Sequence, residues 1–311
     1  MKAIRIHQFG TSDQLIYEDA PTPAPAAGEV CIQVRAVGVN PYDYKIRQGS
    51  VEQVLPHQLP LILGWDVAGD IAALGEGVTD LNVGDPVYVM ANPAKDGAYA
   101  EYIVMDAQVV VPKPKSLTYL EAASIPLAGQ TALQAIYDLG QLQAGQTILI
   151  HGGAGSVGSF AIQLAKAKGA TVYATASGAD QAYITQLGAD KAIDYKTQQF
   201  EELVKDVDLV LDPLGGDVQQ KSWHVLKPGG RLVSTVQPPQ PPADAPTGAQ
   251  GKLVNAQSSA DSLRSLSALI NSGQLKTRVQ KVLPLQAAKQ AHDLLEGGLK
   301  TPGKVVLEVK V

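Results

Sequence analysis

The stretch HGGAGSVG, residues 151–158, decides how the second half of this chain folds. Gly153, Gly155 and Gly158 follow the pattern G-x-G-x-x-G, between a β-type run at 147–151 and helical spacing at 157–168. Glycines in this context permit a tight turn and let backbone amides approach a pyrophosphate at a helix N-terminus. We therefore predict a dinucleotide site, with a glycine-rich turn that binds nothing as the alternative. The residues expected around the pyrophosphate are Gly153, Ala154, Gly155, Ser156, Val157 and Gly158.

Strands and helices alternate around this motif. A helical stretch at 121–139 comes first, and helical segments then separate most of the predicted strands. Such alternation predicts a doubly wound parallel sheet of the Rossmann type. The six predicted strands are 147–151, 171–175, 191–194, 208–212, 231–236 and 252–256.

The first part of the chain has a different pattern. Residues 1–122 form short β-type runs separated by Gly, Pro and Asp, which predicts a barrel-like β domain. Because six strands already complete the Rossmann sheet, we expect 258–311 to return to the first domain. The prediction is thus one domain at 1–122 and 258–311, and an inserted domain at 123–257. The proline-rich segment 237–248 must be a loop.

Composition excludes several classes of protein. The 311 residues carry a formal net charge of -5, which gives no basic surface for nucleic acid or anionic lipid. The single cysteine, Cys31, favours a reducing compartment. The N-terminus lacks the apolar run of a signal peptide, and no stretch is long and apolar enough to span a membrane. We therefore expect a cytoplasmic protein.

The end of the second predicted strand bears on the choice of cofactor. NAD sites usually place an acid there to hold the ribose hydroxyls, and an acid would repel a 2'-phosphate. The segment Ala174–Ser177 contains no acid, and the next one is Asp180. This favours NADPH, with Ser177 and Tyr195 as candidates for the 2'-phosphate. The alternatives are a helix N-cap for Ser177 and a half-buried aromatic for Tyr195.

The chain also resembles the medium-chain dehydrogenase/reductase superfamily, within its zinc-free quinone oxidoreductase and alkenal or enone reductase branch. The resemblance implies a GroES-like catalytic domain split by a Rossmann domain, a cleft where nicotinamide meets substrate, and a homodimer. It covers essentially the whole chain, through GVNPYDYKIRQG (38–49), LGWDVAGDI (63–71), VGDPVYVM (83–90), GAYAEYIV (97–104), PLAGQTAL (126–133), GGAGSVG (152–158) and GKVVL (303–307).

Residue types argue against zinc. Zinc-dependent members of the superfamily place Cys at the position of Asn40 and His at that of Trp65, and neither residue found here is a usual ligand. Asp66 alone cannot hold a catalytic ion. The structural zinc of those members needs four cysteines, whereas this chain has one. We therefore expect no metal.

The resemblance also suggests site residues. It places Asn40 beside the nicotinamide, with Tyr44 and Lys45 lining the cleft and Lys45 as the first candidate donor to a developing oxyanion. Thr131 matches a residue that approaches the nicotinamide. Relatives often grip the 2'-phosphate with Lys or Arg where this chain has Gly178 and Gln181, so Lys304 becomes a candidate for that role.

These candidates have structural alternatives. Tyr44 would be a packing residue, and Lys45 a surface lysine or a partner of Asp43. Thr131 would make a hydrogen bond at the start of a helix. Lys304 would begin an edge strand.

Without a metal, the better substrate is one whose reduction needs less polarisation. Hydride attack on a quinone or an α,β-unsaturated carbonyl delocalises charge onto oxygen, so we predict an NADPH-dependent oxidoreductase for such acceptors. The alternative is a non-catalytic NADPH-binding structural or redox-sensing protein. A short-chain dehydrogenase is excluded, because none of the eleven tyrosines begins a Tyr-x-x-x-Lys motif.

Overall fold

The computed structural model describes residues 1–298 and 302–310. The chain divides into two compact units by its internal contacts. Unit 1 comprises Met1–Leu127, Ser258–Asn271 and Thr277–Val311, and unit 2 comprises Ala128–Gln257 and Ser272–Lys276. In the part of the chain that the structure describes, no helix combines the length and apolar character needed to cross a membrane.

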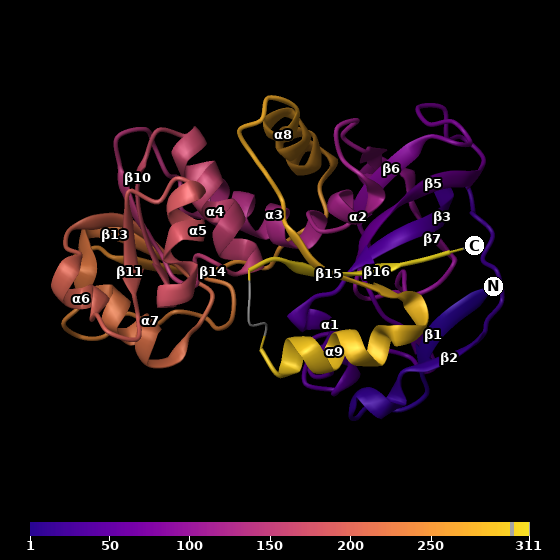
Figure 1. Ribbon diagram of the computed structural model, residues 1–311, viewed down its shortest axis with the longest axis horizontal. Helices are drawn as coiled ribbons and strands as arrows, with labels where there is room; N and C mark the ends of the chain where they lie inside the picture. Colours follow the sequence, from indigo (N-terminus) through magenta and orange to yellow (C-terminus); the bar gives the residue numbers. More distant parts are fainter. Residues whose placement is uncertain (299–301, 311) are drawn as a thin grey trace. The chain divides into compact units, whose positions relative to one another are not determined.

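Unit 2 contains the predicted doubly wound sheet. Its described residues form six parallel strands in the order β11-β10-β9-β12-β13-β14. Helices α4 and α5 lie on one side of these strands, and α6 and α7 on the other (Figure 1). The strands are β9 (Thr147–Ile150), β10 (Thr171–Ala176), β11 (Lys191–Asp194), β12 (Val207–Asp212), β13 (Leu226–Ser234) and β14 (Gln250–Leu253); the helices are α4 (Ser156–Ala167), α5 (Gln181–Gln186), α6 (Phe200–Leu203) and α7 (Gly216–Ser222).

The strand order reverses at β9, and this places the glycine-rich motif. β9 pairs with β10 on one side and with β12 on the other, so the chain winds outward from it in both directions. In open parallel sheets, ligands bind beyond the carboxyl ends of the strands at this switch point. The motif 151–158 follows the carboxyl end of β9 directly.

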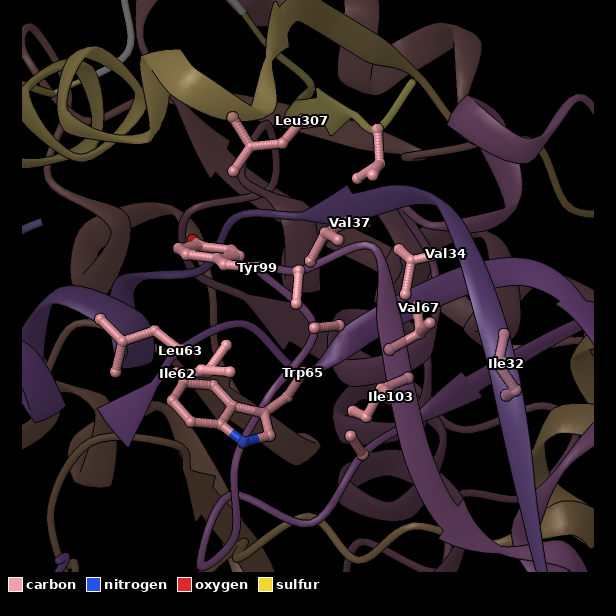
Figure 2. Packing of buried hydrophobic residues seen from close by; sticks show 14 of the residues in the cluster. Ile32, Val34, Val37, Ile62, Leu63, Trp65, Val67, Tyr99, Ile103 and Leu307 are labelled. Atoms are coloured by element: carbon pink, nitrogen blue, oxygen red, sulfur yellow. The ribbon is translucent and has the colours of Figure 1, made fainter. Parts of the chain in front are cut away.

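Unit 1 is the predicted β-rich domain. Among its described residues, one sheet has seven strands in the order β15-β16-β3-β5-β6-β8, with β7 added on β3, and a second has the order β2-β1-β4. Figure 2 shows Trp65 and Tyr99 packed among aliphatic side chains of this unit. The strands are β1 (Lys2–Ile6), β2 (Ile16–Asp19), β3 (Glu29–Gly38), β4 (Leu61–Ile62), β5 (Asp66–Leu74), β6 (Pro86–Met90), β7 (Tyr102–Asp106), β8 (Val111–Pro112), β15 (Val279–Pro284) and β16 (Lys304–Glu308).

The prediction of one continuous helix at 121–139 is wrong. The structure has α2 (Tyr119–Ala122), then α3 (Pro126–Leu133), then a π-helical turn, η3 (Gln134–Leu139). Pro126 lacks a backbone N–H, so it can open a helix but cannot continue one. The last Rossmann strand also begins two residues earlier than the predicted 252–256.

Two helices of unit 1 are joined by a partly buried ion pair. Helix α1 (Pro41–Arg47) lies alongside α9 (Ala288–Glu296) (Figure 1). The Arg47 side chain is fully buried, and its Nη2 lies 2.6 Å from Oε1 of Glu296. This pair ties the helix that follows Asn40 to the C-terminal part of the unit.

A directed chain of hydrogen bonds continues from Arg47. Its Nη1 lies 3.4 Å from Nδ1 of His292, and a guanidinium can only donate, so Nδ1 accepts. The proton of the neutral ring is then on Nε2, which donates to the Tyr99 hydroxyl at 3.1 Å. Tyr99 in turn donates to Oδ2 of Asp43 at 2.8 Å. The chain thus ends on the carboxylate of α1 that faces Asn40.

We predict that His292→Gln reduces the loss of stability in acid. Burial, together with the Arg47 guanidinium, lowers the pKa of His292 from its ordinary value of 6.5 to about 3. The folded state therefore resists the proton that the unfolded chain accepts, and the stability present above the unfolded pKa is lost as pH falls through that window. Glutamine keeps an acceptor and a donor but cannot take up the proton.

The measurement is the free energy of unfolding in urea at several pH values. Between about pH 6 and about pH 4, the free energy of unfolding should fall less steeply with decreasing pH in the variant than in the wild type. The difference in slope should be about 1 kcal/mol per pH unit. His224→Gln, at an exposed position, is the control and should leave the slope unchanged. Equal slopes for His292→Gln and the wild type would contradict the prediction.

Candidate functional site

The glycine-rich turn of unit 2 has the geometry that the motif predicts. A Cβ on Gly158 would lie 2.2 Å from the carbonyl oxygen of Gly152, so only glycine fits where α4 crosses the turn. The Gly153 amide donates to the Thr175 carbonyl of β10 at 2.8 Å, which fixes the turn on the sheet. Gly155 is exposed, and Ala154, Ser156 and Val157 are partly exposed. The N-terminus of α4, whose first amides lack intrahelical partners, is therefore accessible to an anion.

The buried side chain of His151 supports this turn. Its two ring nitrogens lie 3.2 Å from the Thr175 hydroxyl and 2.9 Å from the Ser222 hydroxyl. Thr175 also accepts a hydrogen bond from the Gly152 amide at 3.2 Å. Burial lowers the pKa of His151 to about 4, so the ring is neutral at physiological pH and acts as a structural support.

The carboxyl ends of β10 and β11 bring Ser177 and Tyr195 together with two acids. The Tyr195 amide donates to the Ala176 carbonyl at 3.2 Å, and its side chain is 60% exposed. The Ser177 hydroxyl donates to Oδ2 of Asp180 at 2.6 Å. On the other side, Oδ2 of Asp194 lies 2.8 Å from the point where a Cβ of Gly178 would be.

This arrangement corrects the reading of Asp180. Spacing along the chain placed Asp180 beyond the segment that holds the ribose, but the turn after β10 folds its carboxylate back onto Ser177. Ser177 is the N-cap residue of the short helix η4 (Gly178–Asp180), as its alternative predicted, but its side chain makes no cap bond and donates to Asp180 instead. The candidate ribose end of the site therefore carries negative charge.

A further buried carboxylate holds the loop after β12. Asp212 accepts hydrogen bonds from the Leu214 and Gly215 amides, at 2.9 and 2.8 Å, and from Nε2 of Gln219 at 2.8 Å. Gln219 then accepts from the side chain of Gln237, at the start of the proline-rich loop. No local sequence signal pointed to this set, because it joins residues 212–219 to Gln237 in a separate segment.

In unit 1, Asn40, Asp66 and Lys304 form a buried polar cluster. The Asn40 amide nitrogen donates to Oδ2 of Asp66 at 2.9 Å, and Lys304 Nζ lies 2.9 Å from the same oxygen. Lys304 Nζ also donates to Oδ1 of Asn40. The side chains of Lys304 and Asp66 are 5% and 0% exposed. We call these three residues the Asn40 cluster.

Strand pairing brings the Asn40 cluster together. β3 lies between β5 and β16 in the sheet, and its last residue, Gly38, is paired with both Asp66 and Val306. The ends of three strands therefore meet at one point. The edge-strand alternative for Lys304 is wrong, because β16 has β15 and β3 as neighbours and Lys304 is buried. Its predicted contact with a 2'-phosphate stays a prediction.

The remaining candidates on α1 follow Asn40 directly. Asp43, considered as a partner for Lys45, instead accepts a hydrogen bond from the Asn40 amide at 2.9 Å and one from Tyr99. Burial raises the pKa of Asp43 to about 7. Tyr44 and Lys45 are partly exposed on this helix.

Asp66 also marks the start of α3. Its Oδ1 accepts a hydrogen bond from the Leu127 amide at 2.5 Å. A carboxylate at this end of a helix is favoured by the helix dipole. Thr131 lies on the same helix, about one turn further on, and is buried. Its predicted approach to the nicotinamide remains a prediction.

The side chains at hand do not fit a zinc ion. The resemblance places a Cys ligand of zinc-dependent members at Asn40, whose amide is bonded at both ends within the Asn40 cluster. It places the His ligand at Trp65, which packs edge-on against Tyr42 with ring centroids 6.3 Å apart. Within residues 1–298 and 302–310, no group of three or more His, Cys, Asp or Glu side chains is placed to hold a metal.

Two family models match the chain. Residues 26–115 match an alcohol dehydrogenase GroES-like domain, and residues 187–307 match a zinc-binding dehydrogenase. These matches agree with the β-rich and Rossmann architectures described above.

Individual relatives are similar over nearly all of the chain. It is 35% identical to 2-methylene-furan-3-one reductase of Solanum lycopersicum and 35% identical to the chloroplastic NADPH-dependent alkenal/one oxidoreductase of Arabidopsis thaliana, covering 99% of this chain and 79% of each relative. Among solved structures, the quinone oxidoreductase of Coxiella burnetii is 36% identical, with a TM-score of 0.89 over 100% of this chain and 99% of that one. The chain is thus an oxidoreductase that belongs to the medium-chain dehydrogenase/reductase superfamily, in its quinone and enone reductase branch.

Proposed function

We propose that this protein is a zinc-independent, NADPH-dependent reductase that transfers hydride to a quinone or an α,β-unsaturated carbonyl. The Asn40 cluster carries the proposal. By the resemblance Asn40 stands where zinc-dependent members have a Cys ligand, and its amide is bonded to Asp66 and Lys304. The acceptor class is supported by the relatives, which are named for quinone and enone reduction.

A conjugated acceptor suits a site of this kind. Hydride addition to its conjugated carbon spreads the developing charge onto oxygen, so less polarisation is required than for an isolated carbonyl. The protein must then align the reactants and offer a donor to that oxygen. When bound, the nicotinamide supplies the hydride.

We assign roles to the candidate residues on this basis. The turn 153–158 binds the pyrophosphate, and Asn40 and Thr131 orient the nicotinamide. Lys45, with Tyr44 beside it, faces the acceptor and donates to its oxygen. Both side chains are partly exposed, so a substrate can reach them.

The preference for NADPH is part of the proposal. Ser177 and Tyr195 lie at the strand ends where the adenosine ribose is held in Rossmann domains. Asp180 acts in the opposite direction, since its carboxylate repels a 2'-phosphate. The alkenal/one oxidoreductase relative is named as NADPH-dependent, which supports the phosphorylated cofactor.

We further propose the organisation in which this chemistry takes place. The catalytic domain comprises 1–122 and 258–311, and the NADPH-binding domain comprises 123–257. The protein acts as a homodimer in the cytoplasm. The single cysteine fits a reducing compartment, and the resemblance to the superfamily supports the dimer.

We expect turnover to survive removal of metals. Purified protein is treated with a chelator and then followed by NADPH absorbance with benzoquinone, phenanthrenequinone, acrolein and a longer alkenal, with NADH in parallel. Oxidation of NADPH at an unchanged rate is expected with at least one acceptor. Activity that disappears on chelation and returns with zinc would overturn zinc independence. Tight binding of NADPH without turnover would overturn the proposed reductase activity.

We also expect Asp180→Asn to strengthen the preference for NADPH. Removing the carboxylate relieves repulsion of the 2'-phosphate, so the ratio of kcat/KM for NADPH to that for NADH should rise by about tenfold. Asp138→Asn is the matched control, because Asp138 is exposed and lies ahead of β9, at the opposite end of the strands. A ratio that stays constant in Asp180→Asn would show that this carboxylate does not influence the ribose end.

A further inference from the structure

We infer that Lys304 is a positioning residue for the nicotinamide end of the cofactor and that it acts through Asn40. The inference rests on the proposed function in one respect, namely that Asn40 faces the nicotinamide. It differs from the role that the sequence suggested for Lys304, a grip on the 2'-phosphate at the opposite end of the cofactor.

The charges around Asn40 allow its side-chain amide only one orientation. A carboxylate can only accept hydrogen bonds, so Asp66 requires the amide nitrogen of Asn40. An ammonium can only donate, so Lys304 requires the amide oxygen. A flipped amide would place nitrogen against ammonium and oxygen against carboxylate. Lys304 and Asp66 thus set the direction in which Asn40 presents its donor and acceptor.

The hydrogen-bonding capacity of Asn40 then defines what it can bind. Its amide nitrogen donates one hydrogen to Asp66 and is 3.3 Å from the Gly38 carbonyl, which takes the other. Its oxygen accepts from Lys304 and has a second lone pair. A ligand group that bonds to Asn40 must therefore be a donor. The carboxamide NH2 of nicotinamide is such a group.

The backbone of Asn40 is fixed as well. Its amide donates to Oδ2 of Asp43 at 2.9 Å, and Asp43 is held by the Tyr99 hydroxyl at 2.8 Å. Asn40 itself is 3% exposed. Because both its backbone and its side chain are anchored, the remaining acceptor position of Asn40 is preorganised for a ligand.

The surroundings of Lys304 oppose a role at a distant phosphate. Its ammonium lies 2.9 Å from Asp66 in a buried environment. Moving it to a phosphate would leave the Asp66 carboxylate buried without its cation, which is strongly unfavourable. The ammonium is therefore retained in the Asn40 cluster.

The test is a comparison of four ligands by isothermal titration calorimetry, without any acceptor present. NADPH and NADH contain nicotinamide, whereas 2'-phospho-ADP-ribose and ADP-ribose lack it. We expect Lys304→Met to lower the affinity for NADPH and for NADH by the same factor, about tenfold. The reason is that one oriented hydrogen bond to the nicotinamide, which both ligands contain, is lost. Binding of the two nicotinamide-free ligands should not change.

Three further variants make the test decisive. Lys304→Arg keeps a cation and should recover part of the lost affinity for NADPH and NADH. Lys304→Met combined with Asp66→Asn removes both charges, so it avoids an unpaired buried carboxylate and should show the same ligand pattern. Lys281→Met is the control, because Lys281 is exposed on the neighbouring strand β15 and is paired with Val305.

Other patterns of ligand binding overturn the inference. Weaker binding of NADPH and 2'-phospho-ADP-ribose, with NADH unchanged, would assign Lys304 to the 2'-phosphate. If the affinity for all four ligands fell equally, or if none of the four affinities changed, Lys304 would have a structural role only. Failure of the wild type to bind NADPH or NADH would refute the proposed function itself. Binding by the wild type without turnover would refute only the reductase activity.

Discussion

The buried ion pair between Lys304 and Asp66 is the contact on which the site in unit 1 depends. It joins the first residue of β16 to the first residue of β5, across the end of β3. Taking two charges out of water costs about as much as their attraction returns, so such a pair adds little net stability. The pair instead fixes the orientation of neighbouring groups, because the carboxylate can bond only to donors and the ammonium only to acceptors. Asn40 and the Leu127 amide supply those partners, and removing either charge would leave the other buried and unpaired.

The two units support their candidate binding groups in the same physical way. In unit 2, the glycine-rich turn is held by the Thr175 hydroxyl and carbonyl, with neutral His151 behind them. In unit 1, Asn40 is held by Asp66, Lys304 and Asp43. In each case a second layer of buried polar groups fixes the backbone or side chain that would meet the ligand. Ligand binding then costs less, because the groups are already ordered.

Local patterns were sufficient for the architecture. The glycine motif lies between β9 and α4 as predicted, and the alternation of strands and helices matches the six-stranded parallel sheet of the described part of unit 2. The helix expected at 121–139 failed because a helical pattern of apolar residues continued across Pro126. A proline in such a pattern is itself the signal of a boundary, and it outweighs periodicity.

The contacts within the site could not be predicted from the spacing of residues in the sequence. Asn40 and Lys304 were both candidates, but they are 264 residues apart in the chain, and nothing local indicates that they touch. In the sequence Asp180 is only the next acid after the segment 174–177, whereas in the structure the chain turns back after Ser177 and places the Asp180 carboxylate on the Ser177 hydroxyl. No sequence pattern singled out His292, and only the packing of α9 on α1 shows its place between Arg47 and Tyr99.

The position of β16 has a consequence for how the protein is made. β16 lies between β15 and β3, so the sheet of unit 1 has a gap until residues 304–308 have been synthesised. Unit 2 is nearly continuous in sequence, so it has all its strands before that time and can fold on the ribosome as an independent unit. Unit 1 must wait, with β3 and β5 already made, for a partner that emerges after the whole of unit 2. During that interval part of one edge of β3 has no partner strand, and an unpaired strand edge favours aggregation of the nascent chain.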